Sequence, residues 1–98
     1  MKQAASMQKE IERIQKEMSE KTVTHSVGGG MVTATARGDG TLVSIRIDPK
    51  AVAAGDMEML EDSVVAAVNG ALAEAREMVQ RAMNHVTAGL PIPGLNGR

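Results

Sequence analysis

Basic side chains in two stretches of the sequence could contact phosphate groups. Residues 1–21 carry five lysines and arginines against four glutamates, and two further arginines stand near residue 80. Lys and Arg bind the backbone of duplex DNA without reading its bases. A solvated helix face would have the same composition, so both interpretations stay open. The candidate DNA-contacting residues are Lys2, Lys9, Arg13, Lys16, Arg76 and Arg81.

Residues capable of catalysis are sparse and scattered. The two histidines, His25 and His85, fall in different predicted elements with no motif around them. Nucleophilic catalysis needs a nucleophile, a base and a group that orients the base. The chain has no cysteine, and the spacing typical of metal ligands is missing. We therefore expect no enzyme and no metal, and we expect His25 to be a tolerated residue at a strand end.

Three consecutive glycines, Gly28–Gly30, form the most unusual local pattern of the chain. Glycine adopts positive φ without steric cost, so the triplet predicts a tight strand connection. A phosphate-binding loop would instead need a following Lys and Ser or Thr and would lead into a helix. Neither feature follows the triplet, so we expect a turn here.

Alternating apolar and polar residues predict three short strands around this turn. The stretches are Thr22–Val27, Met31–Arg37 and Thr41–Ile47. Gly38-Asp39-Gly40 is a hairpin signal between the last two, and Pro49 closes the third strand. The pattern predicts an antiparallel sheet with one apolar face and one face of Thr, Ser and Arg. We expect the rest of the chain to cover the apolar face.

Two helices are predicted to flank this sheet. Residues 1–21 carry a heptad-spaced apolar seam, and a much longer helix begins at about Met57, after Asp56 as its N-cap, and ends at about His85. Gly70 inside the long helix predicts either the close approach of another backbone or a glycine that the helix simply tolerates. Additional apolar residues such as Val65 predict burial on more than one side. The element order is α-β-β-β-α, an α+β fold with a three-stranded antiparallel sheet.

The predicted element lengths point beyond a single copy of the chain. Strands of six or seven residues span on the order of 20 Å, whereas a helix of about 29 residues spans roughly 43 Å. The long helix must overhang the sheet while keeping an apolar side, so we expect a two-fold homodimer with projecting helical ends. Residues 1–86 are predicted to form a single domain, and the Gly- and Pro-rich residues 87–98 a flexible tail.

The overall composition narrows the class of protein. Ninety-eight residues make one domain, and the absence of Phe, Tyr and Trp limits the area that its core can bury. It also removes the aromatic stacking used to bind single-stranded nucleic acid and RNA. The net charge of −1 favours no particular partner, and no apolar run approaches membrane-spanning length. We expect a cytoplasmic protein with no membrane partner and no small-molecule substrate.

Five segments of the chain, taken in their order and spacing, carry a resemblance to a known family. The segments are Met7-Gln8-Lys9-Glu10-Ile11, Gly28-Gly29-Gly30-Met31-Val32, Val43 through Ile45-Arg46-Ile47-Asp48-Pro49, Met59-Leu60-Glu61-Asp62 and Val65-Ala66-Ala67-Val68-Asn69. Together with the ending Gly89-Leu90-Pro91-Ile92-Pro93-Gly94-Leu95, they make nearly the whole chain similar to the YbaB/EbfC family of bacterial nucleoid-associated proteins.

The resemblance implies a homodimer of α-β-β-β-α protomers whose helices form tweezers around duplex DNA. It further implies a role in organising DNA in the bacterial nucleoid, with low sequence preference and neither catalysis nor a cofactor. The chain departs from the family at His25, where a small or acidic residue is usual, and at Arg37-Gly38-Asp39-Gly40, which replaces an Asn-Gly turn. The leading hypothesis is a dimeric, non-enzymatic DNA-binding protein. The alternative is an interaction scaffold whose Met- and Ala-rich seams bind a protein partner.

Overall fold

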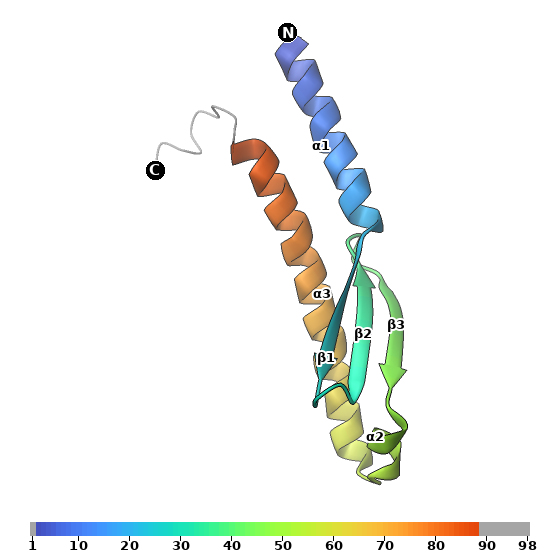
Figure 1. Cartoon of the computed structure of the whole chain (residues 1–98). Helices are drawn as coiled ribbons and strands as arrows, with labels where there is room; N and C mark the ends of the chain where they lie inside the picture. The colour runs from blue at the N-terminus through green and yellow to red at the C-terminus, as the bar shows by residue number, and fades with distance from the viewer. Residues whose placement is uncertain (1, 89–98) are drawn as a thin grey trace.

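Three antiparallel strands lie between an N-terminal helix and a longer C-terminal helix in the computed structural model (Figure 1). The structure describes the backbone of residues 2–88 and the side chains of residues 5–86. The predicted α-β-β-β-α order is confirmed, with one short helix added between β3 and the long helix. The elements are α1 (Lys2–Glu20), β1 (Thr22–Val27), β2 (Val32–Arg37), β3 (Leu42–Ile47), α2 (Pro49–Ala53) and α3 (Met57–Ala88).

Tight glycine turns connect the three strands, which lie in the order β1-β2-β3. Gly28, Gly29 and Gly30 all have positive φ, and the Gly30 N–H donates to the Val27 carbonyl over 3.2 Å. The predicted turn is therefore confirmed. Glycine is required at these positions because only glycine adopts three such conformations in succession without strain. The predicted long helix also continues past His85 to Ala88, so two of the residues assigned to the tail are helical. Residues 89–98 lie outside the described part of the chain.

The second turn is held by the side chain of Asp39. Its carboxylate accepts the Thr41 backbone N–H over 2.9 Å and the Thr41 hydroxyl over 2.5 Å. The hydroxyl hydrogen bond, followed by the backbone one, lowers the pKa of Asp39. An Asp that bonds the backbone two residues ahead fixes a turn, so this contact sets the register of β2 against β3.

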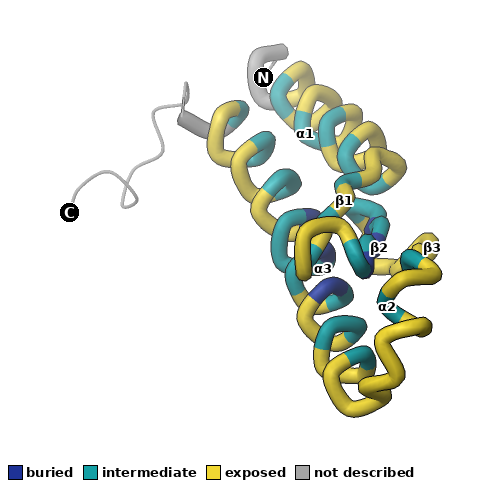
Figure 2. The backbone as a smooth tube through the Cα atoms, turned by 60° about the horizontal axis from the view of Figure 1, so that its bottom comes forward, coloured by how far each residue is buried: buried dark blue, intermediate teal, exposed yellow. Residues whose placement is uncertain are grey.

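Alanines bring α3 close to the sheet. Ala67, Ala71 and Ala75 recur every four residues and pack on Val32, Ala34 and Ala36 of β2, and these six residues form the buried core (Figure 2). Small side chains on both surfaces allow the helix axis to approach the strands closely, but they bury little apolar area per residue. The core of a single copy is consequently thin.

One strand of the sheet lacks cover. Residues that pair across an antiparallel ladder share a face, so Ile45 and Ile47, opposite Ala34 and Val32, belong to the face on which α3 packs. They remain 39 and 38% exposed, because α3 packs mainly on β1 and β2. The expectation that the chain covers its whole apolar face is wrong for β3. Val65 of α3 is 58% exposed, so burial on more than one side of that helix is also wrong within a single copy.

The overhang of α3 is confirmed, and α1 covers part of it. The chain measures 63 × 28 × 16 Å, and α1 runs antiparallel to the second half of α3 beyond the end of the sheet (Figure 1). The seam residues Met7, Ile11, Ile14 and Met18 are half-buried. Both α1 and the sheet therefore pack on α3, one after the other along its length.

Gly38 lies where the end of α1 meets the β2–β3 turn. Its N–H donates to the Lys21 carbonyl over 2.9 Å, and a Cβ at this position would overlap the Met18 carbonyl group and lie 3.2 Å from a Val79 methyl group. The variant Gly38→Ala should lose about 3 kcal/mol of stability, because the obstructing atoms are backbone and the last turn of α1 must shift. Thermal unfolding followed by circular dichroism measures this loss.

Gly40 in the same turn offers the control for this substitution. It has φ +91° and nothing within 4 Å of an added Cβ, so Gly40→Ala tests backbone strain without a clash. We expect a loss of about 1 kcal/mol for Gly40→Ala. Equal destabilisation by the two substitutions would show that the contact between α1 and the turn is unimportant.

His25 and Gly70 form a contact that joins β1 to α3. The His25 Nδ1 bonds the Glu74 carboxylate, and a Cβ added at Gly70 would lie 2.7 Å from His25 Cγ and closer still to other ring atoms. The expectation of a close backbone at Gly70 is wrong, because an imidazole ring occupies that space. His25 is likewise a partnered residue within the strand rather than a tolerated one at its end.

A double-mutant cycle can test the His25–Gly70 contact. Gly70→Ala should destabilise the protein by about 1–3 kcal/mol, because the ring must leave Glu74 to make room for the methyl group. In a His25→Ala background the same substitution should stabilise by up to about 1 kcal/mol, since Ala is the better helix former. Thermal unfolding of the four proteins gives the coupling energy. Identical effects of Gly70→Ala in both backgrounds would contradict the contact.

Candidate nucleic-acid interface

Three of the candidate cations line one face of α1. Lys9, Arg13 and Lys16 are spaced four and three residues apart, so they fall within about 60° of each other around a helix of 3.6 residues per turn. All three are exposed. The seam that packs on α3 lies on the opposite side of α1, so these three residues, here called the α1 stripe, point away from α3.

The three cations of the α1 stripe differ in their ion pairs. Arg13 bonds Glu10 over 2.5 Å and Glu17 over 2.6 Å. The hydrogen bond and charge of Glu10, then those of Glu17, raise the pKa of Arg13. Within residues 5–86, Lys9 and Lys16 have no ion pair. Both lysines can therefore take a phosphate without first leaving a carboxylate, whereas Arg13 would exchange one anion for another.

The two α3 candidates do not lie together. Arg76 and Arg81 are five residues apart, which places them about 140° apart around the helix and on opposite flanks. Both are exposed, and Arg81 is paired with Glu77 over 3.2 Å. The side chain of Lys2 lies outside the described residues. The structure thus brings three of the six predicted residues onto one face and separates the two on α3.

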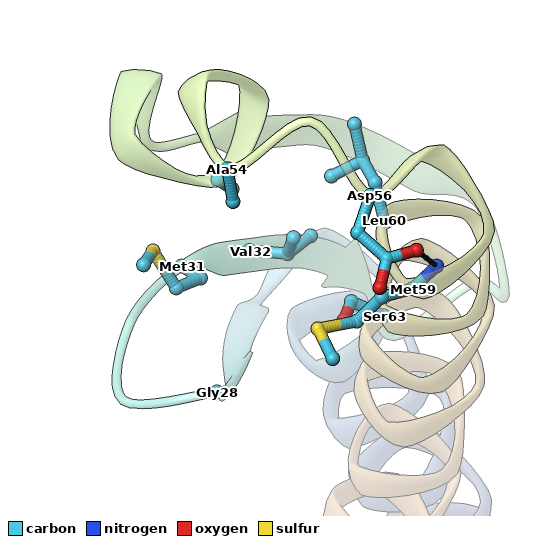
Figure 3. Close-up of a pocket in the computed structure, with 9 residues that line it drawn as sticks. Gly28, Met31, Val32, Ala54, Asp56, Met59, Leu60 and Ser63 are labelled. Atoms are coloured by element: carbon cyan, nitrogen blue, oxygen red, sulfur yellow. Dashed lines mark hydrogen bonds between the residues drawn. The ribbon is translucent and has the colours of Figure 1, made fainter.

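A hollow of about 260 Å³ lies at the other end of the molecule, between α2, the glycine turn and the start of α3 (Figure 3). Its walls are mostly apolar, including Met31, Val32 and Leu60. The Asp56 carboxylate in its wall accepts the Met59 N–H over 3.0 Å as the N-cap of α3. Asp56 and Ser63 are the polar side chains among its lining residues, which include no cation.

The described part of the chain meets the requirements of neither a metal site nor a membrane-spanning helix. Within it, no group of three or more His, Asp or Glu side chains is arranged to hold a metal ion. No helix there combines the length and the apolar character needed to cross a bilayer.

Two basic residues of the sheet are not among the sequence-based candidates. Arg37 of β2 and Arg46 of β3 lie on the face opposite α3, and neither has an ion pair within residues 5–86. The available signal was the strand alternation, which puts both arginines among Thr and Ser residues. They are not among the candidates because the sequence pattern predicts phosphate contacts on the projecting helices.

Comparison with known proteins shows that the chain matches a protein family. The model of the YbaB/EbfC DNA-binding family matches residues 1–90. A nucleoid-associated protein of Thermoanaerobacter sp. (strain X514) is 54% identical over 97% of this chain and 86% of its own length. A nucleoid-associated protein of Moorella thermoacetica is 49% identical over 96% of this chain and 90% of its own.

A solved structure has a similar fold. The crystal structure of the uncharacterized protein HP0035 from Helicobacter pylori superposes with a TM-score of 0.63 at 26% sequence identity. The match covers 80% of this chain and 90% of that one. The arrangement of helices and sheet described above is therefore shared with an experimentally determined relative.

Proposed function

Because the chain belongs to the YbaB/EbfC DNA-binding family, we propose that it is a nucleoid-associated protein that binds duplex DNA as a homodimer. Binding would be mainly to phosphates, with low sequence preference, and would organise or protect bacterial DNA. The family match over residues 1–90 carries this proposal, supported by relatives named nucleoid-associated proteins.

The uncovered side of the sheet supports the homodimer. Leu42, Val43, Ile45 and Ile47 of β3 are each about two-fifths exposed. Val65 lies on the flank of α3 opposite Gly70, which faces β1, so Val65 faces the β3 side. We call these five residues the open β3 face. An edge strand whose apolar face is left in water invites association, and a two-fold related copy covers two such faces at once.

The exposed cations support phosphate contact rather than base reading. On a chain of net charge −1, Lys9 and Lys16 have no ion pair with any side chain of residues 5–86, and they point into solvent from a helix that extends past the sheet. Proteins with this character attract the DNA backbone electrostatically and without regard to sequence. Lys2, Lys9, Arg13, Lys16, Arg76 and Arg81 remain the proposed contacts, with the α1 stripe as the main one.

Fluorescence anisotropy of a dye-labelled 30-base-pair duplex, titrated with the protein over a salt series, tests the proposed function. A second duplex of scrambled sequence is measured in parallel. Similar affinities for both duplexes that fall steeply with salt would support the proposal, and the slope gives the number of phosphates neutralised. Absence of binding at low salt would overturn it and favour the alternative, a scaffold for a protein partner.

A further inference from the structure

The outer face of the sheet, opposite α3, has an unusual composition. Eight side chains of the three strands lie on it, and all are Thr, Ser or Arg. They are Thr22, Thr24, Ser26, Thr33, Thr35, Arg37, Ser44 and Arg46. The strands contain no Asp or Glu, although the chain has twelve acidic residues. The strand residues of the outer face are therefore hydroxyl groups with two positive charges and no negative one, and Asp39 in the adjoining turn is a carboxylate that interacts with the charge of Arg37.

This outer face continues the surface formed by the α1 stripe. Ala67, Ala71, Ala75 and Val79 form one row on α3, whose first three members meet the sheet and whose last lies near the end of α1. The sheet and α1 thus pack on the same side of α3, end to end (Figure 1). Their opposite surfaces, the outer face and the α1 stripe, point away from α3 in a common direction.

The length of this combined surface suits a duplex. From Lys9 to the end of α1 is about 17 Å. Arg37 pairs with Thr22 at the start of β1, and Arg46 lies opposite Thr33, roughly 14 Å from Arg37. With the junction included, the basic residues extend over about 35–40 Å, which is close to one helical turn of B-DNA.

We propose that the outer face of the sheet is part of the DNA-binding surface and that Arg37 and Arg46 contact phosphates beyond those held by the α1 stripe. Charge complementarity carries this assignment: the two arginines have no ion pair within residues 5–86, and the strands themselves hold no carboxylate. Arg37 interacts through its charge with Asp39 in the adjoining turn, where it lowers the pKa of that carboxyl group. The surrounding hydroxyls can donate to phosphate oxygens, as Ser and Thr do in protein–DNA interfaces. The inference rests on the proposed function for its ligand and adds a second element to its site.

The double variant Arg37→Gln/Arg46→Gln tests this assignment in the anisotropy assay. Affinity for the 30-base-pair duplex should fall about tenfold at 0.1 M salt, and the salt slope should decrease by about 2 per protomer in contact, since each lost phosphate contact removes about 0.9. Arg37→Lys/Arg46→Lys should keep the slope, because the charge is retained. Lys50→Gln, which removes an exposed cation on α2, should change affinity less than about twofold.

The outcomes separate this inference from the proposed function. Steep, salt-dependent binding by the wild-type chain with an unchanged slope in Arg37→Gln/Arg46→Gln would overturn the sheet contact alone. Lower affinity without a change in slope would also overturn it, because the arginines would then not be neutralising phosphates. No binding by the wild-type chain would overturn both. Far-UV circular dichroism checks that the variants are folded, which we expect because neither arginine has an ion pair within residues 5–86.

Discussion

The triple variant Lys9→Glu/Arg13→Glu/Lys16→Glu is expected to bind a 30-base-pair duplex at least about 100-fold more weakly than the wild-type chain at 0.1 M salt. Each lost phosphate contact is worth about 1 kcal/mol, and three such losses amount to about two orders of magnitude. The slope of log affinity against log salt should decrease by about 3 for each protomer that contacts the duplex. Anisotropy across the salt series measures both quantities.

Two controls separate loss of contact from loss of structure in this triple variant. The neutral variant Lys9→Gln/Arg13→Gln/Lys16→Gln adds no new carboxylates beside Glu10 and Glu12, so α1 should keep its helical signal while affinity falls about 100-fold through the three lost contacts alone. Sedimentation should show an unchanged oligomeric state, because the α1 stripe lies opposite the seam. Wild-type affinity in both variants would remove α1 from the DNA-binding site and leave the arginines of α3 and of the sheet.

Local patterns explain why much of the fold could be predicted from the sequence. The alternation in Thr22–Val27 and the glycine triplet after it depend only on neighbouring residues, and both match the structure. The Asp56 cap is equally local, since its carboxylate bonds the N–H three residues ahead. The α1 stripe also follows from spacing alone, because residues 9, 13 and 16 share a helix face.

Contacts between distant residues could not be predicted in the same way. The partner of His25 is Glu74, 49 residues away, and the residues next to either one in the sequence do not indicate this contact. The exposure of β3 depends on the path of α3 across β1 and β2, which alternation does not reveal. The separation of Arg76 from Arg81 is different, because a spacing of five residues already places them on opposite flanks of a helix.

The open β3 face gives the largest expected effect on assembly. Ile45→Glu should convert the proposed homodimer to a monomer. Each of the two symmetry-related copies would place one unpaired carboxylate in the apolar interface, so two would be buried together. At about 3 kcal/mol for each carboxylate, the dimer dissociation constant rises by roughly four orders of magnitude. Sedimentation velocity over a range of concentrations measures this change. Val65→Glu, on the α3 side of the same face, should act in the same direction.

Ser44→Glu provides the matched control for Ile45→Glu, since it introduces the same charge on the adjacent residue of β3 but on the outer face of the sheet. It should leave the dimer intact while weakening DNA binding, because the new carboxylate stands among the residues proposed to contact phosphates. Ile45→Glu should also weaken DNA binding, because a monomer lacks the cations of the second protomer. A duplex held by two linked sites dissociates more slowly than one held by a single site. A variant Ile45→Glu that remained dimeric would place the second copy elsewhere, and the apolar residues of β3 would then be available to a protein partner of a different kind.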